Sequence, residues 1–252
     1  MSYRSYDPGF GGGFDPMSRM MRSTAVRALI FINIGVYLLE LIARLMGRFD
    51  FVLGLFGMVP ILITTKFFVW QFLTATFLHS DFFHILFNML GIFFFGPDLE
   101  WQWGRNRFLG VYLAIGILAN VFAYLLDIHA ASVTLGASGA VFGILGAYAA
   151  LYPNRQLIFL IFPIKAKWLV LFYFIFSLLG TAGLEGTGGT AYAVHLAGIV
   201  LGVLYVKFRW EPLTSFFRNI GPRIRLWYLR RKYKNWQVID DRREKRWDDY
   251  QN

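Results

Sequence analysis

Six apolar segments constrain what this chain can fold into more than any other feature of its sequence. They cover residues 26–45, 83–101, 108–126, 138–152, 168–184 and 191–208. A helix needs about 20 apolar residues to cross the hydrocarbon of a bilayer, and only the fourth segment, at 15 residues, falls well short. Charged residues make up 16% of the chain, against about a quarter in soluble domains. We therefore predict an all-α, polytopic membrane protein with a bundle of six transmembrane helices.

The short fourth segment, which begins at Ser138, is predicted to start inside the membrane rather than at its surface. Chain that enters at this depth must line a cavity or be buried in protein, because lipid cannot satisfy its backbone polar groups. The long link over residues 47–81 is still apolar and aromatic, which favours the outer membrane interface.

Positive charge lies almost entirely on one side of the predicted spans. All but three of the 25 Lys and Arg residues fall in the N-terminal segment, in the links after the second and fourth spans, or in the C-terminal segment. The exceptions are Arg44, Arg48 and Lys66, around the first loop. The positive-inside rule then places both termini in the cytoplasm, which requires an even number of spans. We expect an integral, multi-pass protein of the cell membrane of a bacterium.

The chain is predicted to have three parts. Residues 1–23 are polar and Gly-rich and are expected to form a flexible cytoplasmic leader. Residues 24–209 form the six-span core. Residues 210–252 form a basic cytoplasmic tail, in which residues 223–231 have the pattern of an amphipathic surface helix. Such a tail can bind nucleic acid, but beside a span we favour contact with anionic membrane lipid, and we expect no nucleic-acid partner.

Ser138 is a candidate nucleophile. It stands in Gly136-Ala137-Ser138-Gly139 at the head of the fourth segment, where a hydroxyl within the bilayer is costly. A serine at this point can also cap the helix, and the small residues around it can form a tight seam between helices. Taken alone, the pattern favours a structural role.

His195, in the sixth segment, makes a catalytic role for Ser138 more favourable relative to a structural one. Gly198 and Gly202 follow it on the same helix face and form a GxxxG-type seam. The fourth segment, with glycines of its own, is the natural partner of this seam, and their packing would bring His195 toward Ser138. A histidine beside a serine can take its proton and make it nucleophilic. A lone histidine in a span could instead relay protons or join two helices by a hydrogen bond.

His84 and Asn88 are one helical turn apart at the start of the second segment, so their side chains share a face. Both can donate hydrogen bonds, and donors aimed at a developing oxyanion are often the largest catalytic contribution. The backbone N–H of Ser138, at a helix start, would add a further donor. The same two side chains can equally hold helices together without any chemistry. His79, five residues before His84, could line the same cavity or lie in the outer interface, and we favour the interface.

We expect no metal site and no cofactor. The chain has no cysteine, which excludes thiolate ligands and a thiolate nucleophile. Its four histidines form no HExxH motif.

Together these motifs resemble those of the rhomboid family of intramembrane serine proteases. The resemblance covers residues 24–209 and rests on three motifs, each weak alone and specific as a set. In chain order they are His84-Ile85-Leu86-Phe87-Asn88, Gly136-Ala137-Ser138-Gly139, and His195-Leu196-Ala197-Gly198 followed by Gly202. The sequence departs from the usual family pattern at Gln71, where arginine is common after the Trp, and at Val194, where alanine is common.

The resemblance implies a serine endopeptidase with a Ser138–His195 dyad and no acidic third member. It implies an oxyanion hole made by His84, Asn88 and the Ser138 amide, and an aromatic ring, that of Phe142, stacked on His195. The stretch from Glu100 to Arg105 resembles a structural region at the cytoplasmic side of the family's second span. The residues expected to support the site are Gly136, Gly139, Phe142, Gly198 and Gly202.

We therefore expect an enzyme that cleaves transmembrane segments of single-span membrane proteins near the outer leaflet, with these substrates and membrane lipids as its partners. The competing interpretation is a catalytically silent rhomboid-like scaffold or chaperone that binds transmembrane helices. A transporter fits less well, because the sequence shows no internal repeat and has few acidic residues in its spans.

Overall fold

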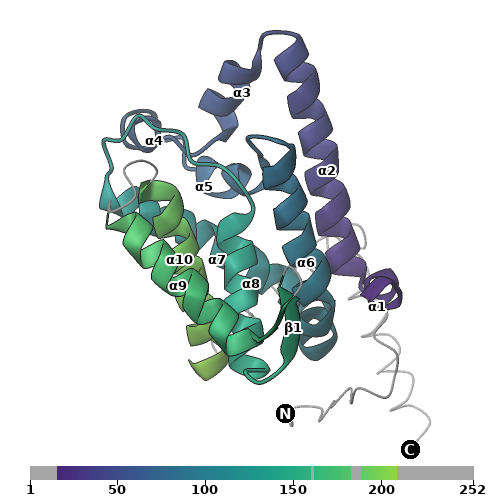
Figure 1. The fold of residues 1–252 in the computed structure, drawn as a ribbon. Helices are drawn as coiled ribbons and strands as arrows, with labels where there is room; N and C mark the ends of the chain where they lie inside the picture. The colour runs from purple at the N-terminus through teal and green to yellow at the C-terminus, as the bar shows by residue number, and fades with distance from the viewer. Residues whose placement is uncertain (1–15, 160–161, 183–188, 209–252) are drawn as a thin grey trace, which may run out of the picture.

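The computed structural model describes residues 16–159, 162–182 and 189–208, and helices dominate this part of the chain (Figure 1). Helix α2 runs along one side of the bundle, and α9 and α10 run along the other. In chain order the elements are α1 (Pro16–Arg22), α2 (Thr24–Leu45), α3 (Phe49–Phe56), α4 (Pro60–Lys66), α5 (Gln71–Thr74), the 3₁₀ helix η1 (Ala75–Phe77), α6 (Phe82–Trp103), α7 (Arg105–Leu126), α8 (Ser138–Leu151), β1 (Gln156–Phe159), β2 (Phe162–Lys165), α9 (Ala166–Thr181) and α10 (Gly189–Phe208).

Four of these helices, α2, α6, α7 and α10, are long and apolar enough to cross a membrane. The apolar helices α8 and α9 are shorter, with 14 and 16 residues. Large apolar side chains are exposed along α2 and α9, for example Phe31 at 68% and Phe172 at 52%, as expected of helix faces that meet lipid. The protein is therefore a polytopic helical membrane protein, and the count of six spans stays a prediction.

Each of the six predicted apolar segments coincides with one of the helices α2, α6, α7, α8, α9 and α10, and no predicted end differs by more than three residues. The agreement follows from the charged, proline and glycine residues that mark the ends of the apolar runs. The antiparallel hairpin of β1 and β2, which joins α8 to α9, was not predicted. Its strands have four residues each, too few to give a recognisable alternation.

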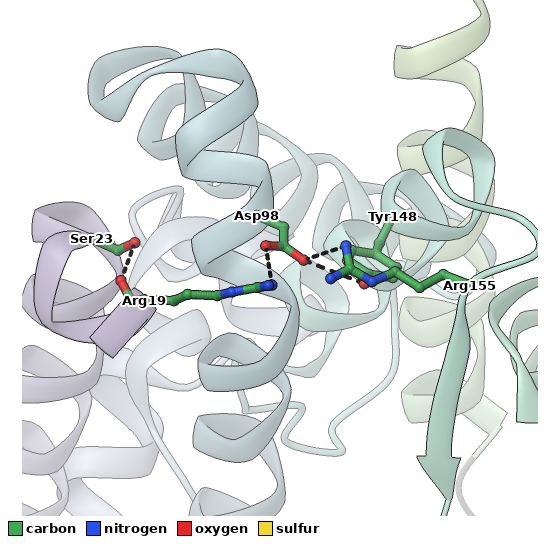
Figure 2. A network of polar contacts seen from close by, with 5 residues as sticks. All are labelled: Arg19, Ser23, Asp98, Tyr148 and Arg155. Atoms are coloured by element: carbon green, nitrogen blue, oxygen red, sulfur yellow. Dashed lines mark hydrogen bonds and ion pairs between the residues drawn. The ribbon is translucent and has the colours of Figure 1, made fainter. Parts of the chain in front are cut away.

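Helix α1 forms residues 16–22 of the predicted flexible leader, and for these residues alone the structure differs from the prediction. Arg19 of α1 donates to Asp98 Oδ1 on α6 at 2.9 Å, and Arg155, which follows α8, pairs with Asp98 Oδ2 at 2.9 Å (Figure 2). The hydroxyl of Tyr148 lies 3.4 Å from the same Oδ2. One carboxylate thus holds α1 and the end of α8 against α6. Residues 1–15 and the predicted tail, including its amphipathic segment, lie outside the described residues.

The carboxylate of Glu100 caps the start of α2. Its oxygens accept hydrogen bonds from the N–H of Ala25 at 2.9 Å and of Val26 at 2.9 Å. The first N–H groups of a helix have no partner within the helix itself, and Ser23, the residue before α2, provides no side-chain cap. Glu100, from the stretch expected to be structural, satisfies these groups from the neighbouring helix.

The first loop is built of short helices that are joined through Gln71. This side chain is fully buried; its Oε1 accepts from the N–H of Val59 at 3.0 Å, and its Nε2 donates to the carbonyl of Gly54 at 2.8 Å. Gln71 therefore links α3, the start of α4 and α5. An amide side chain suits this position because it satisfies one donor and one acceptor without a buried charge.

Helix α8 occupies the centre of the bundle and contacts α6, α7, α9 and α10. Its seam with α10 brings the two backbones together: a Cβ atom at Gly198 would collide with the carbonyl oxygen of Gly139, and one at Gly202 with that of Gly143. Only glycine permits such an approach. The predicted packing of the fourth segment on the sixth is confirmed, and it fixes where Ser138 and His195 meet.

Candidate active site

Ser138 is the first residue of α8 and follows a sharply bent connection. Gly136 has φ of 124°, a backbone conformation that favours glycine, and its N–H donates to the carbonyl of Ala75 at 2.8 Å. Upstream, Thr134 pairs with Met58 of the first loop through two backbone hydrogen bonds of 2.9 Å. The approach to Ser138 is thus fixed by the first loop before the helix begins.

The side chains of Ser138 and His195 meet between α8 and α10. The Oγ of Ser138 lies 2.8 Å from the Nε2 of His195, within hydrogen-bond distance. Both residues are partly buried. A hydroxyl at this distance can pass its proton to the imidazole as it attacks an electrophile.

The ring of His195 is packed by aromatic side chains. Phe142, one turn after Ser138 in α8, has its ring centroid 4.4 Å from that of His195, with 32° between the planes. The ring centroid of Tyr173 in α9 lies 5.1 Å from that of Phe142, and Tyr192 stands edge-on to His195 with centroids 6.3 Å apart. The expected contact between Phe142 and His195 is present.

The imidazole of His84 lies against Gly136, close to Ser138. A Cβ atom built on Gly136 would lie 2.6 Å from Nε2 of His84 and 3.7 Å from Oγ of Ser138. The imidazole therefore occupies the space that a side chain at this glycine would need, next to the serine. The other predicted donor, Asn88, is buried on the same helix, and its Nδ2 donates to the carbonyl of His84 at 3.0 Å. No hydrogen bond joins Asn88 to Ser138 among the described side chains.

His79 lies beside the candidate site, and its expected place at the outer interface stays a prediction. Its side chain is fully buried and stands edge-on to His84, with ring centroids 5.2 Å apart. Its backbone N–H donates to both carboxylate oxygens of Glu40 in α2, at 3.1 and 3.2 Å. A short segment before α6 is thus pinned to α2 directly behind the candidate site.

Comparison with known proteins identifies the fold. A family model described as the rhomboid domain matches residues 66–212, which is more than half of the chain. The chain belongs to the rhomboid family. The match includes the His84, Ser138 and His195 motifs, so the residues that meet around Ser138 lie within the rhomboid domain.

Curated relatives come from bacteria and from mitochondria. Rhomboid protein 1, mitochondrial, of Saccharomyces cerevisiae is 31% identical over 135 residues, 52% of this chain and 39% of that protein. The putative rhomboid protease YdcA of Bacillus subtilis is 44% identical over 79 residues, 31% of this chain and 39% of that protein. Rhomboid protease GluP of the same bacterium is 39% identical over 90 residues, 35% of this chain and 17% of that protein. The chain therefore covers less than half the length of these rhomboid relatives.

Several residues around the rhomboid site were not singled out from the sequence. Tyr192 precedes His195 by three positions, so helical spacing could have placed it on the same face. Tyr173 and Glu40 have no such signal, because they come from other helices, and Ser80 lies before the start of α6, where helical spacing does not apply. Within the described ranges, no three His, Asp and Glu side chains gather closely enough to hold a metal ion.

Proposed function

We propose that this rhomboid protein is an intramembrane serine endopeptidase that cleaves transmembrane segments of single-span membrane proteins near the outer leaflet. The observation that carries the proposal is the 2.8 Å contact between Ser138 Oγ and His195 Nε2. Two bacterial relatives bear the name rhomboid protease, one of them as putative, which supports the same activity.

In the proposed reaction, Ser138 Oγ attacks the carbonyl carbon of the scissile peptide while Nε2 of His195 takes the hydroxyl proton. The protonated imidazole then gives this proton to the leaving amine. Water then repeats these steps on the acyl-enzyme. His195 takes a proton from the water as its oxygen attacks the acyl carbon, and returns that proton to Ser138 Oγ as the acyl–oxygen bond breaks. No acidic third member is required, because the rings of Phe142 and Tyr192 hold the imidazole in place.

The oxyanion of each tetrahedral intermediate needs donors aimed at it in advance. We assign this role to Nε2 of His84, to the backbone N–H of Ser138 at the start of α8, and to the side chain of Asn88. The N–H of Ser138 also benefits from the positive end of the helix dipole. Asn88 can serve through the N–H that does not bind the carbonyl of His84.

The proposed topology has six spans, with the shorter α8 starting inside the membrane so that Ser138 lies below the outer surface. Both termini are cytoplasmic, in accordance with the distribution of Lys and Arg. The core is residues 24–209, and the basic segment over residues 210–252 contacts anionic lipid on the cytoplasmic face. We place the protein in a bacterial cell membrane, although some relatives are named as mitochondrial.

The alternative is a silent rhomboid scaffold that grips transmembrane helices through small residues. The glycines that could bind another helix are not available to it, because Gly198 and Gly202 of α10 pack against Gly139 and Gly143 of α8. This internal use of the seam favours the enzyme.

Reporter cleavage tests the proposal. Purified protein in detergent or liposomes is given a library of single-span reporters, and products are followed by gel. We expect cleavage by wild type, and a rate at least about 10³-fold lower for Ser138→Ala and His195→Ala, as for other nucleophile and base deletions. Ser132→Ala, in the exposed link before α8, is the matched control and should cleave normally. Undiminished cleavage by Ser138→Ala would exclude the dyad.

A further inference from the structure

Three polar groups form a hydrogen-bonded chain just before α6. The carboxylate of Asp81 accepts the N–H of His84 at Oδ1, at 3.0 Å, and the hydroxyl of Ser80 at Oδ2, at 2.7 Å. Because its proton goes to Asp81, the same hydroxyl oxygen accepts from Nδ1–H of His84 at 3.0 Å, so Nε2 can also donate only when the imidazole carries both protons. Asp81 is thus both the N-cap of α6 and the partner that orients Ser80.

The chain fixes which edge of the His84 ring faces the candidate nucleophile. With Nδ1 held at Ser80, the opposite nitrogen, Nε2, is the one that lies against Gly136 beside Ser138. A rotation of the ring by 180° about its Cβ–Cγ bond would place a carbon atom at Ser80 in place of Nδ1 and a carbon atom at Gly136 in place of Nε2. The contact with Ser80 would then be lost. Hydrogen bonds from the Ser80 hydroxyl and from the N–H of His84 lower the pKa of Asp81, which keeps this acceptor ionised.

The backbone that carries Ser80 is itself held from α2. Arg44 donates from a terminal guanidinium nitrogen to the carbonyl of Ser80 at 2.6 Å. One residue earlier, the N–H of His79 donates to the carboxylate of Glu40. Arg44 and Glu40, one turn apart on α2, therefore hold the backbone at Ser80 and at the residue before it. This places the Ser80 hydroxyl beside His84.

We propose that Ser80, oriented by the ionised carboxylate of Asp81, is a positioning residue that accepts Nδ1–H of the protonated His84 imidazole and holds its Nε2–H toward the oxyanion formed at Ser138. This role rests on the proposed protease function. Ser80 contacts neither the nucleophile nor the base, and it acts only through the orientation of His84. A donor that is aimed before the reaction needs no reorganisation when charge develops, so loss of Ser80 affects the chemical step rather than substrate binding.

The test is a comparison of Ser80→Ala with the conservative variant Ser80→Thr, which keeps a hydroxyl on Cβ. For Ser80→Ala we expect kcat to fall about tenfold, since a donor is displaced rather than removed, while KM stays within about twofold. Ser80→Thr should recover most of the lost rate. Ser132→Ala, on the exposed link before α8, should match wild type. Thermal unfolding of each variant in detergent checks that the fold is kept.

A double-mutant cycle distinguishes this role from a purely structural one, because it measures whether the effect of Ser80→Ala on labelling depends on His84. Fluorophosphonate labelling of Ser138 is timed in wild type, Ser80→Ala, His84→Ala and the double variant, at high probe concentration. Because Ser80 acts through His84, its loss should cost nothing more once His84 is absent.

Equal kcat for wild type and Ser80→Ala, or additive losses in the cycle, would overturn this inference and leave the protease intact. Equal cleavage by wild type and Ser138→Ala would instead refute the proposed function.

Discussion

At the scale of single residues, the site depends on how two imidazole rings are held. The ring of His195 contacts those of Phe142 and Tyr192, and its Nε2 lies 2.8 Å from Ser138 Oγ. His84 is held from behind by the buried ring of His79 and from the side by Ser80. Rings fixed by packing and hydrogen bonds keep their catalytic atoms in place without a further cost in conformational entropy.

His79 should make the stability of the protein sensitive to acid. Burial, and then the nearby His84, lower the pKa of His79 from 6.5 to about 4 in the folded protein. The unfolded chain takes up a proton near pH 6.5 and the folded protein only near pH 4, so stability is complete above pH 6.5 and is lost as the pH falls toward 4. The loss amounts to about 3 kcal/mol at most.

The measurement is the unfolding temperature in detergent between pH 7 and pH 4, for wild type and His79→Phe, which keeps an aromatic ring but does not titrate. The wild-type temperature should fall more steeply with acid than that of the variant. Parallel curves would contradict the assignment to His79.

Some residue contacts could be predicted from the sequence and others could not. The approach of Ser138 and His195 was predictable, because glycines at helical spacing mark which faces of two helices can pack closely. The burial of His79 was not, because it depends on Glu40 in another helix accepting its N–H. The hydrogen bond from Asn88 to the carbonyl of His84 could not be predicted either. The spacing of the two residues is the same whether the amide binds this carbonyl or an oxyanion.

At the scale of elements, the seam between α8 and α10 carries the geometry of the site. The two helices meet with backbone against backbone at Gly139, Gly143, Gly198 and Gly202. Hydropathy predicted both helices to within two residues of their ends. The hairpin of β1 and β2 and the helix α1 were missed, because strands of four residues and a helix of seven are too short to show a periodicity.

Gly202→Ala should separate the two helices. The added methyl group would collide with the carbonyl oxygen of Gly143, and backbone cannot move aside as a flexible side chain can. We expect a loss of at least about 1–3 kcal/mol in stability, as for other overpacked sites. A shift of about 1 Å in His195 would lower labelling of Ser138 by up to about 10²-fold.

Gly35→Ala is the matched control, since a Cβ atom there meets no atom within 4 Å. It should label at the wild-type rate and be equally or more stable. Wild-type labelling by Gly202→Ala would contradict the close seam.

At the scale of the whole molecule, two carboxylates of α6, one buried and one partly buried, tie the ends of other helices together. Glu100 caps α2 and Asp98 joins α1 to the segment after α8. These contacts lie at the end of the bundle away from Ser138, which begins α8, whereas Tyr148 near the end of α8 meets Asp98. The sequence indicated a structural region here but not its partners, because both ion pairs join distant parts of the chain.

Asp98→Asn should release α1. The amide cannot pair with both Arg19 and Arg155, and a partly buried guanidinium left without its partner costs about 1–3 kcal/mol. Trypsin should then cut at Arg19 and Arg22 faster than in wild type, as followed by mass spectrometry. Asp127→Asn, an exposed aspartate at the end of α7, should leave the digestion unchanged. Equal protection of α1 in Asp98→Asn and wild type would show that this carboxylate does not hold the helix.

The central claim is that His195 makes the hydroxyl of Ser138 nucleophilic within the bundle. Its most direct test is mass spectrometry of the protein after reaction with a fluorophosphonate, for wild type, Ser138→Ala and His195→Ala. We predict one adduct, on Ser138, absent from Ser138→Ala and formed at least about 10²-fold more slowly in His195→Ala. An unmodified Ser138 in wild type, or equal labelling without His195, would contradict it.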